Sequence, residues 1–518
     1  MKHLSILFVL PFLLAASCHR EPAPASEPDR SIVIVYENDV HCGIDGYAKF
    51  AGYRDAIVAA DTAWVATVSC GDFLQGGVAG SLSSGQYVVD IMKTVGYDAV
   101  TLGNHEFDYG GERMMELLPQ TGASILCANF FLYGASQPVY PAYTLKSYGS
   151  RKVAFVGVLA PETMLDESYS FYDADGKQLF DLRTDDVVSL VQSAVDEARS
   201  KGADYVVLLS HMGEVHPALG ISSHELVAAT SGIDVVLDGH THSVIVRDEV
   251  ADKNGKAVPV TQTGTQFANV GKLVIGVNGS ISTTLIPVAD IPWENAAVAE
   301  ATNRVKEQMD QVTARKVATT AFELTINGAD GKRLIRKDET NLGDLVTDAF
   351  RIVMKAQIGL CNGGGIRASI AAGDITYGNV VDVQPFDNHL AVIEATGAQI
   401  LTMLRESTKS LPNEEGQFPQ VSGLKYTIRQ GSHTISDVSV LEDASGQWKP
   451  LEEASTYTIA LSDYYQGGGF YDTLKDCKLL TLGASLTRDA LADYLEKTLG
   501  GTVPEIYAQA QGRITVQD

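Results

Sequence analysis

The chain has 518 residues, which is too long for one ordinary hydrophobic core and predicts two or three domains. Hydrophobic residues make up 45% and charged residues 20% of the chain, proportions that exclude a mostly disordered protein. The net charge is −25, and a field of that sign repels nucleic-acid duplexes and anionic membrane surfaces. Any site for an anionic substrate must therefore carry its own local positive charge.

The N-terminal segment predicts an export signal and a tether rather than part of the fold. A basic start precedes an apolar run over residues 4–14, which is typical of a secretory signal. Small residues then end at Cys18, as in the bacterial lipobox, where the cysteine is lipidated and becomes the new N-terminus. We predict a signal peptide over residues 1–18 and a proline-containing tether over 19–30. The chain would then be an exported lipoprotein at the periplasmic or surface face of a bacterial envelope, touching the membrane only through its lipid. Simple cleavage and secretion is the alternative.

Short apolar runs that alternate with helical patterns predict an α/β layered domain from residue 31 onward. The helical pattern is clearest from Thr184 to Ser200, with Thr184 as the expected N-cap. The expected strands cover residues 32–36, 64–69, 99–102, 125–128, 153–159, 205–209, 235–237, 258–261 and 272–277. Residues that directly follow such strands gather at the carboxyl edge of the sheet, where these folds bind ligands.

Side chains that can bind metals follow five of these strands. The set comprises two carboxylates, one amide and four imidazoles: Asp39, His41, Asp72, Asn104, His211, His240 and His242. Mixed oxygen and imidazole ligands suit Zn²⁺, Mn²⁺, Fe²⁺ or Co²⁺ better than Ca²⁺. Since one ion rarely needs seven ligands, the set predicts two ions that share a bridging carboxylate, a centre suited to in-line phosphoryl displacement. Taken singly, each residue could instead be a turn residue, a cap or a core histidine.

The motifs Asp-x-His, Gly-Asp, Gly-Asn-His-Glu, Ser-His and Gly-His-Thr-His, in that order, resemble the calcineurin-like metallophosphoesterases. The longer string from Gly103 to Asp108 resembles the bacterial exported 5′-nucleotidase family, which includes UDP-sugar hydrolases and 2′,3′-cyclic-nucleotide phosphodiesterases. The resemblance implies a four-layer αββα metallophosphoesterase domain over residues 31–290. A linker helix over 291–318 and a smaller α/β substrate-binding domain over 319–518 would follow.

The resemblance also divides the ligands between two metal sites. One ion would be held by Asp39, His41, Asp72 and His242, and the other by Asp72, Asn104, His211 and His240. Asp72 would therefore bridge the two ions. His105 would not be a ligand: oriented by Asp108, it would donate a proton or hydrogen bond to the transferred phosphoryl group.

The second half of the chain carries the residues expected to hold the substrate. The string from Asn362 to Arg367 contains three consecutive glycines, whose backbone N–H groups can face an anion, and an arginine that can bind phosphate. A plain turn is the alternative. The string resembles the family's C-terminal signature, and Arg336 matches a second family arginine that binds phosphate. The expected substrate-binding residues are Arg336, Asn362, Gly364, Arg367, Phe386, Asn388 and Tyr464.

Two segments resemble the loops that stack on the nucleobase in the family. Gln384–Asn388 resembles Gln-Pro-Phe-Gly-Asn, with Asp387 in place of the glycine, although Phe386 could equally be a core residue. Ser462–Phe470 resembles the second loop, with Tyr464 in place of the stacking phenylalanine and Phe470 in place of an aspartate. These departures leave the identity of the substrate open.

Together these features predict a dinuclear-metal phosphohydrolase. By resemblance it is a 5′-nucleotidase that releases phosphate from nucleoside 5′-monophosphates through in-line attack of a metal-bound hydroxide. A 2′,3′-cyclic-nucleotide phosphodiesterase with 3′-nucleotidase activity, a UDP-sugar or dinucleotide pyrophosphatase, and a thiosulfate-ester hydrolase are alternatives at the same site. A non-catalytic nucleotide-binding surface lipoprotein is a remote alternative. The resemblance also implies a rotation between the domains. Whether the chain is a monomer or a dimer, and whether Cys42 pairs with Cys70, stay open.

Overall fold

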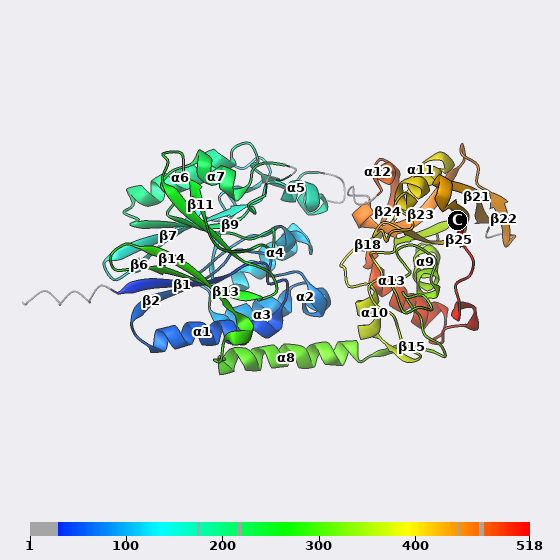
Figure 1. Cartoon of the computed structure of the whole chain (residues 1–518), viewed down its shortest axis with the longest axis horizontal. Coiled ribbons are helices and arrows are strands. Elements are labelled where there is room, and N and C mark those ends of the chain that lie inside the picture. The colour runs from blue at the N-terminus through cyan, green and yellow to red at the C-terminus, as the bar shows by residue number, and fades with distance from the viewer. Residues whose placement is uncertain are drawn as a thin grey trace, which may run out of the picture.

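The computed structural model describes residues 30–172, 177–215, 217, 219–442, 445–465 and 471–517. The predicted signal peptide, Cys18 and Phe470 lie outside these ranges. Two domains lie side by side and are joined by helix α8 (Ala296–Thr313), which runs along the lower edge of the molecule in Figure 1. The helix lies where a linker was expected. In the described part of the chain, no helix is both long and apolar enough to cross a membrane.

Two six-stranded sheets pack face to face in the N-terminal domain. The first has the order β14-β13-β1-β2-β3-β4, and its strands are β1 (Ser31–Glu37), β2 (Ala63–Ser69), β3 (Ala99–Thr101), β4 (Ser124–Leu126), β13 (Asn269–Ile275) and β14 (Ile281–Pro287). The second has the order β11-β12-β10-β9-β7-β6, and its strands are β6 (Tyr143–Tyr148), β7 (Arg151–Leu159), β9 (Tyr205–His211), β10 (Val235–Leu237), β11 (Val244–Ala251) and β12 (Ala257–Thr263). All nine expected strands are present.

Helices cover the outer face of each sheet. Strand β1 shows why, because Ile34 and Tyr36 pack between the sheets whereas Val33 and Val35 alternate with them and pack under helices. The first sheet is covered by α1 (Tyr47–Ala59), α3 (Gln86–Val95) and α8, and the second by α6 (Val187–Ser200) and α7 (Ser223–Ala229). The predicted αββα order is confirmed.

Two local expectations are wrong. Helix α6 begins at Val187 with Asp186 at its N-cap position, and the hydroxyl of Thr184 donates to the carbonyl of Leu182 at 3.0 Å instead of capping the helix. The last expected strand ends at Ile275, because Gly276 to Gly279 form a tight turn, in which Gly279 N donates to Gly276 O.

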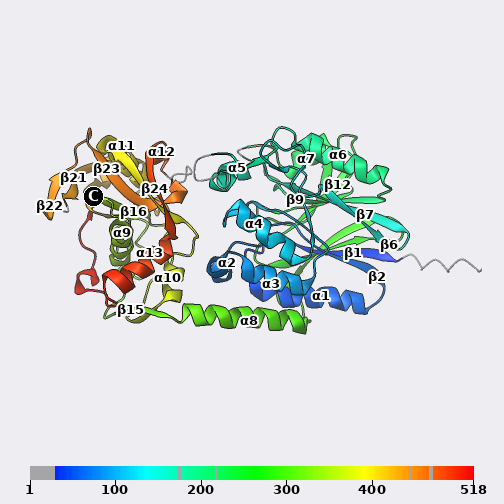
Figure 2. The same cartoon turned by 180° about the vertical axis from the view of Figure 1, so that it is seen from behind.

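The C-terminal domain is built on a five-stranded sheet of order β19-β16-β23-β18-β24. Its strands are β16 (Ile358–Asn362), β18 (His389–Thr396), β19 (Pro419–Ser422), β23 (Thr456–Ser462) and β24 (Lys478–Leu486). One face packs on α9 (Asn341–Val353), α10 (Tyr377–Val383) and α13 (Thr487–Asp493), and the other on α11 (Gly397–Thr408) and strand β20 (Leu424–Arg429) (Figure 2). The expected smaller α/β domain is therefore present.

Candidate dinuclear metal site and substrate-binding residues

The predicted metal ligands meet at the carboxyl edges of the two central sheets. Strands β1, β2 and β3 run parallel, so that Asp39, Asp72 and Asn104, which follow them, reach one edge. Strands β9 and β10 also run parallel, with His211 at the end of β9 and His240 after β10. The loops that follow both sets of strands therefore converge at the carboxyl edge, as expected from the sequence.

One group of four ligands fits a divalent cation. Their ligand atoms lie within 4.8 Å of one another in Asp39, His41, Asp72 and His242. His41 Nε2 and His242 Nε2 face each other at 2.9 Å, and Asp72 Oδ2 lies 3.6 Å from His41 Nε2. Asp39 Oδ1 lies 3.5 Å from His242 Nε2. Facing imidazole nitrogens flanked by carboxylates form a donor set that a cation such as Zn²⁺ or Mn²⁺ prefers.

The remaining predicted ligands form a second group, which again includes Asp72. His211 Nδ1 lies 2.7 Å from Cys70 O, which turns Nε2 into the site, and among the described residues this buried nitrogen has no well-aligned hydrogen bond. Asp72 Oδ2 lies only 3.1 Å from that nitrogen. On the far side, His240 Nδ1 lies 3.0 Å from Asn104 Oδ1. Because a buried imidazole nitrogen normally has a partner, this geometry fits a second metal ion.

The backbone holds most of these ligands in an uncommon conformation. Positive φ angles occur at Asp39 (52°), His41 (42°), Asp72 (58°), His240 (79°) and His242 (58°). Residues other than glycine rarely adopt this region, and each instance costs about 1–3 kcal/mol. The surrounding structure must hold the strained loops in place, so the ligands are preorganised by the fold.

Glu106 is a functional residue to which the sequence interpretation gave no role. Its buried carboxylate accepts hydrogen bonds from four backbone N–H groups, those of Asp72 (2.8 Å), Phe73 (2.8 Å), Leu74 (3.1 Å) and Gly103. It thereby ties the loop after β2 to the loop after β3. Its place inside the Gly-Asn-His-Glu motif was the available signal, since a buried carboxylate needs hydrogen-bond donors.

The two carboxylates of the metal site respond differently to their surroundings. Burial raises the pKa of Asp39 to about 7, against the opposing effect of the His211 imidazole. Burial would also raise the pKa of Asp72, but the imidazoles of His211, His105 and His41 outweigh it and hold that pKa well below its usual value. The ionised form of Asp72 is therefore favoured, which suits the predicted role of its carboxylate as a metal ligand.

His105 and Asp108 form the expected pair beside the metal ligands. His105 Nδ1 lies 3.0 and 3.2 Å from the two carboxylate oxygens of Asp108, and its backbone N–H donates to Asp72 Oδ1 at 2.9 Å. Burial would lower the pKa of His105, but the carboxylates of Asp72, Asp108 and Glu167 outweigh burial and raise it well above its usual value. The imidazolium form is thus favoured, and the side chain stays 34% exposed, open to a substrate.

Two carboxylates that sequence reasoning missed approach the site histidines. Glu162 Oε1 lies 2.6 Å from His240 Nε2, and Glu167 Oε1 lies 3.9 Å from His105 Nδ1. They flank the short helix α5 (Thr163–Asp166), which follows β7. The expected strand end at Leu159 was the available signal, since β7 runs parallel to β9 and ends at the same edge.

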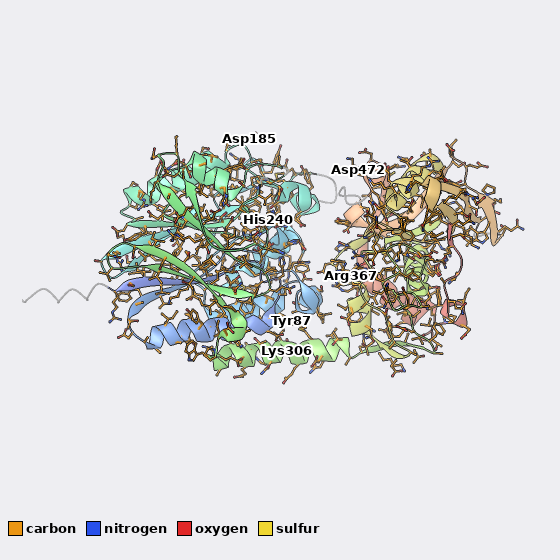
Figure 3. All side chains as sticks on the ribbon, in the orientation of Figure 1. Tyr87, Asp185, His240, Lys306, Arg367 and Asp472 are labelled. Atoms are coloured by element: carbon orange, nitrogen blue, oxygen red, sulfur yellow. The ribbon has the colours of Figure 1, made fainter. Side chains whose placement is uncertain are left out.

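Two predicted phosphate-binding arginines lie near each other in the C-terminal domain. Burial and the neighbouring cations of Arg333 and Arg367 lower the pKa of Arg336. Among the described residues, the buried Nε of Arg336 has no hydrogen-bond partner. Arg367 lies on the face of the C-terminal domain that is turned toward the N-terminal domain, and His240 lies on the N-terminal domain (Figure 3). An anion between the two guanidinium groups would relieve their repulsion.

The three consecutive glycines do not present their N–H groups to an anion, so this expectation is wrong. The three groups donate to carbonyl oxygens: Gly363 to Phe418 (2.7 Å), Gly364 to Gly416 (2.8 Å) and Gly365 to Asn362 (2.9 Å). Glycine is required here for close packing, because a Cβ at Gly363 would lie 2.3 Å from the carbonyl oxygen of Ile335. The absence of a side chain at Gly363 instead lets this segment pack closely against the backbone of Ile335 and Arg336.

The two side chains expected to stack on a base are exposed to solvent, whereas the predicted substrate-binding residue Asn362 is buried. Phe386 is 40% exposed and Tyr464 47% exposed, so the alternative of a core role for Phe386 is wrong. The guanidinium carbon of Arg367 lies 5.9 Å from the Phe386 ring centroid. Asn362, in contrast, is buried, and its backbone N–H donates to the hydroxyl of Tyr465 at 3.1 Å. Asn388 directly precedes β18 and is partly buried.

Asp387, which replaces a family glycine, joins the two domains. Its carboxylate pairs with the buried guanidinium of Arg488 in its own domain. It also accepts hydrogen bonds from two hydroxyls of the metal domain, Ser81 Oγ at 3.1 Å and Tyr109 at 2.9 Å. Arg488 in turn donates to Ser81 O at 2.9 Å. We call this cluster of Asp387, Arg488, Ser81 and Tyr109 the interdomain cluster.

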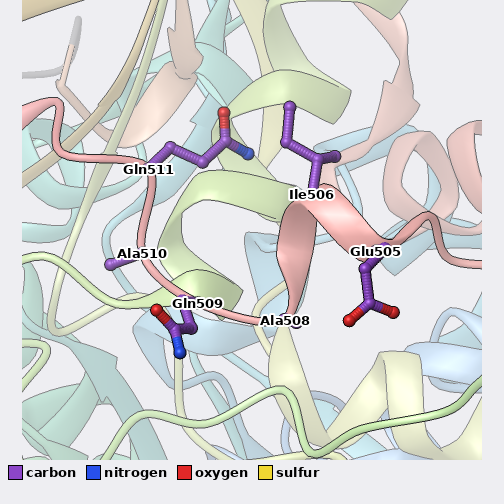
Figure 4. Close-up of a pocket in the computed structure, with 6 residues that line it drawn as sticks. All are labelled: Glu505, Ile506, Ala508, Gln509, Ala510 and Gln511. Carbon is purple, nitrogen blue, oxygen red and sulfur yellow. The ribbon is translucent and has the colours of Figure 1, made fainter.

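One cavity of the described chain lies apart from this site. A cavity of about 450 Å³ on the C-terminal domain contains none of the predicted site residues. It is open, and its lining is Glu505, Ile506, Ala508, Gln509, Ala510 and Gln511 (Figure 4). The cysteines at 42 and 70 are both buried free thiols, which answers the question of their pairing.

Two family models match the chain in the order that the motifs imply. The calcineurin-like phosphoesterase model matches residues 32–244, and the 5′-nucleotidase C-terminal domain model matches residues 316–476. The fold and the site therefore define a metal-dependent phosphoester hydrolase. With both domains in this order, the chain belongs to the 5′-nucleotidase family.

Relatives and solved structures agree with this assignment. The chain is 25% identical over 533 residues to a Vibrio cholerae 5′-nucleotidase, covering 93% of each. It is 27% identical over 489 residues to the Bacillus subtilis trifunctional nucleotide phosphoesterase YfkN, covering 86% of this chain but only 32% of that protein, so it spans about a third of YfkN. A 5′-nucleotidase precursor from Thermus thermophilus shares the fold, with a TM-score of 0.63 at 24% identity over 94% of this chain and 99% of that one.

Proposed function

We propose that the protein is a 5′-nucleotidase that hydrolyses nucleoside 5′-monophosphates to a nucleoside and phosphate. The observation that carries the proposal is the pairing of a group of predicted metal ligands on one domain with two neighbouring arginines on the other, one of which, Arg367, lies beside the exposed Phe386 ring. A nucleoside monophosphate requires a site that contacts its phosphate, a surface that contacts its base, and metal ions at the reacting phosphorus. The names of the Vibrio cholerae and YfkN relatives, both nucleotide enzymes, support this class of substrate.

The residues divide the reaction between the domains. Two divalent ions bound by the seven ligands would polarise the phosphoryl group and activate a water. Arg336 and Arg367 would bind the phosphate, and Phe386 and Tyr464 would stack on the base. His105, held by Asp108, would donate its proton to the oxygen that leaves phosphorus. Asn362, Gly364 and Asn388 would shape the substrate-binding surface.

Phosphate release by the purified protein tests the proposal. The protein is supplied with Mn²⁺ or Zn²⁺ and given AMP, UMP, 2′,3′-cyclic AMP, UDP-glucose and para-nitrophenyl phosphate, with a coupling phosphatase for the cyclic nucleotide and UDP-glucose. AMP or UMP should be the best substrates, and His105→Ala should reduce their turnover by about 10²–10⁴-fold. A clear preference for UDP-glucose or the cyclic nucleotide would keep the mechanism and replace the substrate.

We propose in addition that the chain is exported and anchored by a lipid at Cys18. The basic, apolar and small-residue pattern of residues 1–18 supports this. Metabolic labelling with palmitate should mark the wild-type protein, and Cys18→Ser should remove the label and release the protein from the membrane fraction. A labelled Cys18→Ser variant would contradict the anchor.

A further inference from the structure

The turn around helix α5 is an element of the site that no motif of the sequence marks. It follows β7, and its backbone is fixed to the site, since Ala160 N donates to His211 O at 3.0 Å. Within the turn, Glu167 N donates to Thr163 O at 2.9 Å. The turn therefore fixes two carboxylates, Glu162 and Glu167, next to the predicted metal ligands at the carboxyl edges of the sheets.

Glu162 meets the predicted metal ligand His240 at the ring nitrogen opposite the one that faces Asn104. Its Oε1 lies 2.6 Å from Nε2 of His240, and both side chains are largely buried, with 16% and 15% exposed. A carboxylate accepts, so Nε2 carries the hydrogen and Nδ1 carries the lone pair. That lone pair faces Asn104 Oδ1 at 3.0 Å, and a cation bound by both atoms would satisfy these two facing acceptors. The hydrogen bond to Glu162 thus selects the tautomer that can bind metal through Nδ1.

Glu167 lies at an ion-pair distance from His105, longer than a hydrogen bond. It is only 7% exposed, and its Oε1 lies 3.9 Å from His105 Nδ1, on which Asp108 also acts. The three side chains have their polar atoms within 4.8 Å of one another. Two carboxylates at Nδ1 leave Nε2 of His105 as the atom that can reach a substrate.

We propose that the α5 turn is a positioning element in which Glu162 orients His240 for metal binding and Glu167 orients His105 toward the substrate. Both residues act through another side chain and neither touches the substrate. The proposal rests on the metal site and on His105, and it does not depend on which phosphate ester is the substrate.

Metal binding by chelator-treated protein tests the Glu162 arm. In Glu162→Ala, Mn²⁺ titration should show one of the two ions bound about 10–100-fold more weakly, the usual cost of losing an outer partner of a metal ligand. The Mn²⁺ electron paramagnetic resonance spectrum should change from that of a coupled pair to that of an isolated ion. Glu162→Gln, whose amide oxygen can still accept from Nε2, should recover most of the affinity.

Glu214→Gln is the matched control, because Glu214 supports the same loop through the hydroxyls of Thr241 and Ser243, and its hydrogen bonds among the described residues do not include the His240 ring. It should bind both ions as the wild type does. Wild-type affinity for both ions in Glu162→Ala would overturn the proposal, as would an equal loss in Glu214→Gln. Should Glu162→Ala not fold, Glu162→Asp, which withdraws the carboxylate by one methylene, carries the same expectation.

A double-mutant cycle tests the Glu167 arm. Glu167→Gln should keep both Mn²⁺ ions and the wild-type KM for phenyl phosphate, while kcat falls roughly 10-fold, the lower end of the outer-partner range. In a His105→Ala background the same substitution should have no further effect, because its only route to the reaction is gone. Multiplicative losses in the double variant would overturn the Glu167 role. If His105→Ala alone has wild-type kcat, the role proposed for His105 fails, and the Glu167 arm fails with it.

Discussion

The metal-binding loops and the substrate-binding segments are built in opposite ways. Most of the predicted metal ligands are buried, with Asp39, Asp72 and His211 at most 1% exposed, although the His242 side chain is 43% exposed. Several of these ligands have positive φ. The residues for substrate recognition lie at the surface of the second domain, with Phe386 at 40% and Tyr464 at 47% exposure. The first region is fixed by the fold before anything binds, and the second is open to whatever ligand arrives.

The two regions therefore suit different tasks, the metal-binding loops catalysis and the proposed substrate-binding segments recognition of the substrate. A dinuclear centre needs ligands placed to within a fraction of an ångström, which buried loops on parallel strands provide. A stacking surface tolerates small displacements, because a ring and a base attract each other over a broad range of offsets. We therefore expect substitutions in the metal loops to abolish activity with all substrates, and those in the second domain to change the choice among substrates.

Asp72→Asn should have the largest effect. The amide cannot bridge two cations as a carboxylate does, so both ions should bind much more weakly and turnover of every ester should fall by at least about 10⁴-fold, as for groups that act as a unit. Metal content by mass spectrometry and phosphate release from para-nitrophenyl phosphate measure this. A variant with two tightly bound ions would show that Asp72 is not the bridge.

The metal site could be predicted from the sequence because its order of motifs follows its order of strands. Asp39, Asp72 and His211 each stand within three residues of the end of an apolar run, and parallel strands bring such residues to one edge of a sheet. Glu162 escaped notice because one glutamate after a proline has no distinctive spacing. The role of Glu106 depends on four backbone N–H groups, which no side-chain pattern reveals.

Asp387→Ala should have the next largest effect, a loss of folding stability at the contact between the two domains. It leaves the Arg488 guanidinium buried without its carboxylate, which costs about 3–5 kcal/mol of folding free energy. Scanning calorimetry should show a lower unfolding temperature, and the double variant with Arg488→Met should recover most of it. Ser81→Ala, which removes a single hydroxyl contact, should cost only about 1 kcal/mol. Equal losses in Asp387→Ala and Ser81→Ala would contradict the central place of the ion pair.

The interdomain cluster lay beyond sequence reasoning for a physical reason. Asp387 could be recognised as a departure from the family's glycine, but its partners are about 100 residues later in the chain and about 300 residues earlier. Only the docking of the two domains brings Ser81, Tyr109 and Arg488 to one carboxylate. The glycines were equally hard to interpret from the sequence, because the N–H groups of Gly363 and Gly364 donate to carbonyls of a distant loop and that of Gly365 donates to the carbonyl of Asn362.

Arg367→Lys should weaken substrate binding without touching the metals. A lysine keeps the charge but loses the planar fork that binds phosphate through two hydrogen bonds, so KM for AMP should rise about 10–100-fold, the equivalent of one or two charge-assisted bonds. Arg333→Lys is the matched control, because that side chain is paired with Glu414 on the domain surface. Steady-state kinetics of both variants should show the rise only at Arg367, and an equal rise at Arg333 would point to the general charge of the surface instead.

Phe386→Ala should have the smallest effect and the most selective one. The exposed ring can stack on a base but contributes little to the core, so its loss should raise KM for AMP about 5–10-fold, or roughly 1 kcal/mol of stacking, and leave stability nearly unchanged. Para-nitrophenyl phosphate makes a poor match to the base-binding surface, and its kcat/KM should change by less than about twofold if the ring serves recognition alone. The ratio of the two kcat/KM values is therefore the measurement, since it cancels any change in active enzyme. An equal loss with both substrates would place Phe386 in the alignment of the domains, next to Asp387, rather than in the recognition of the base.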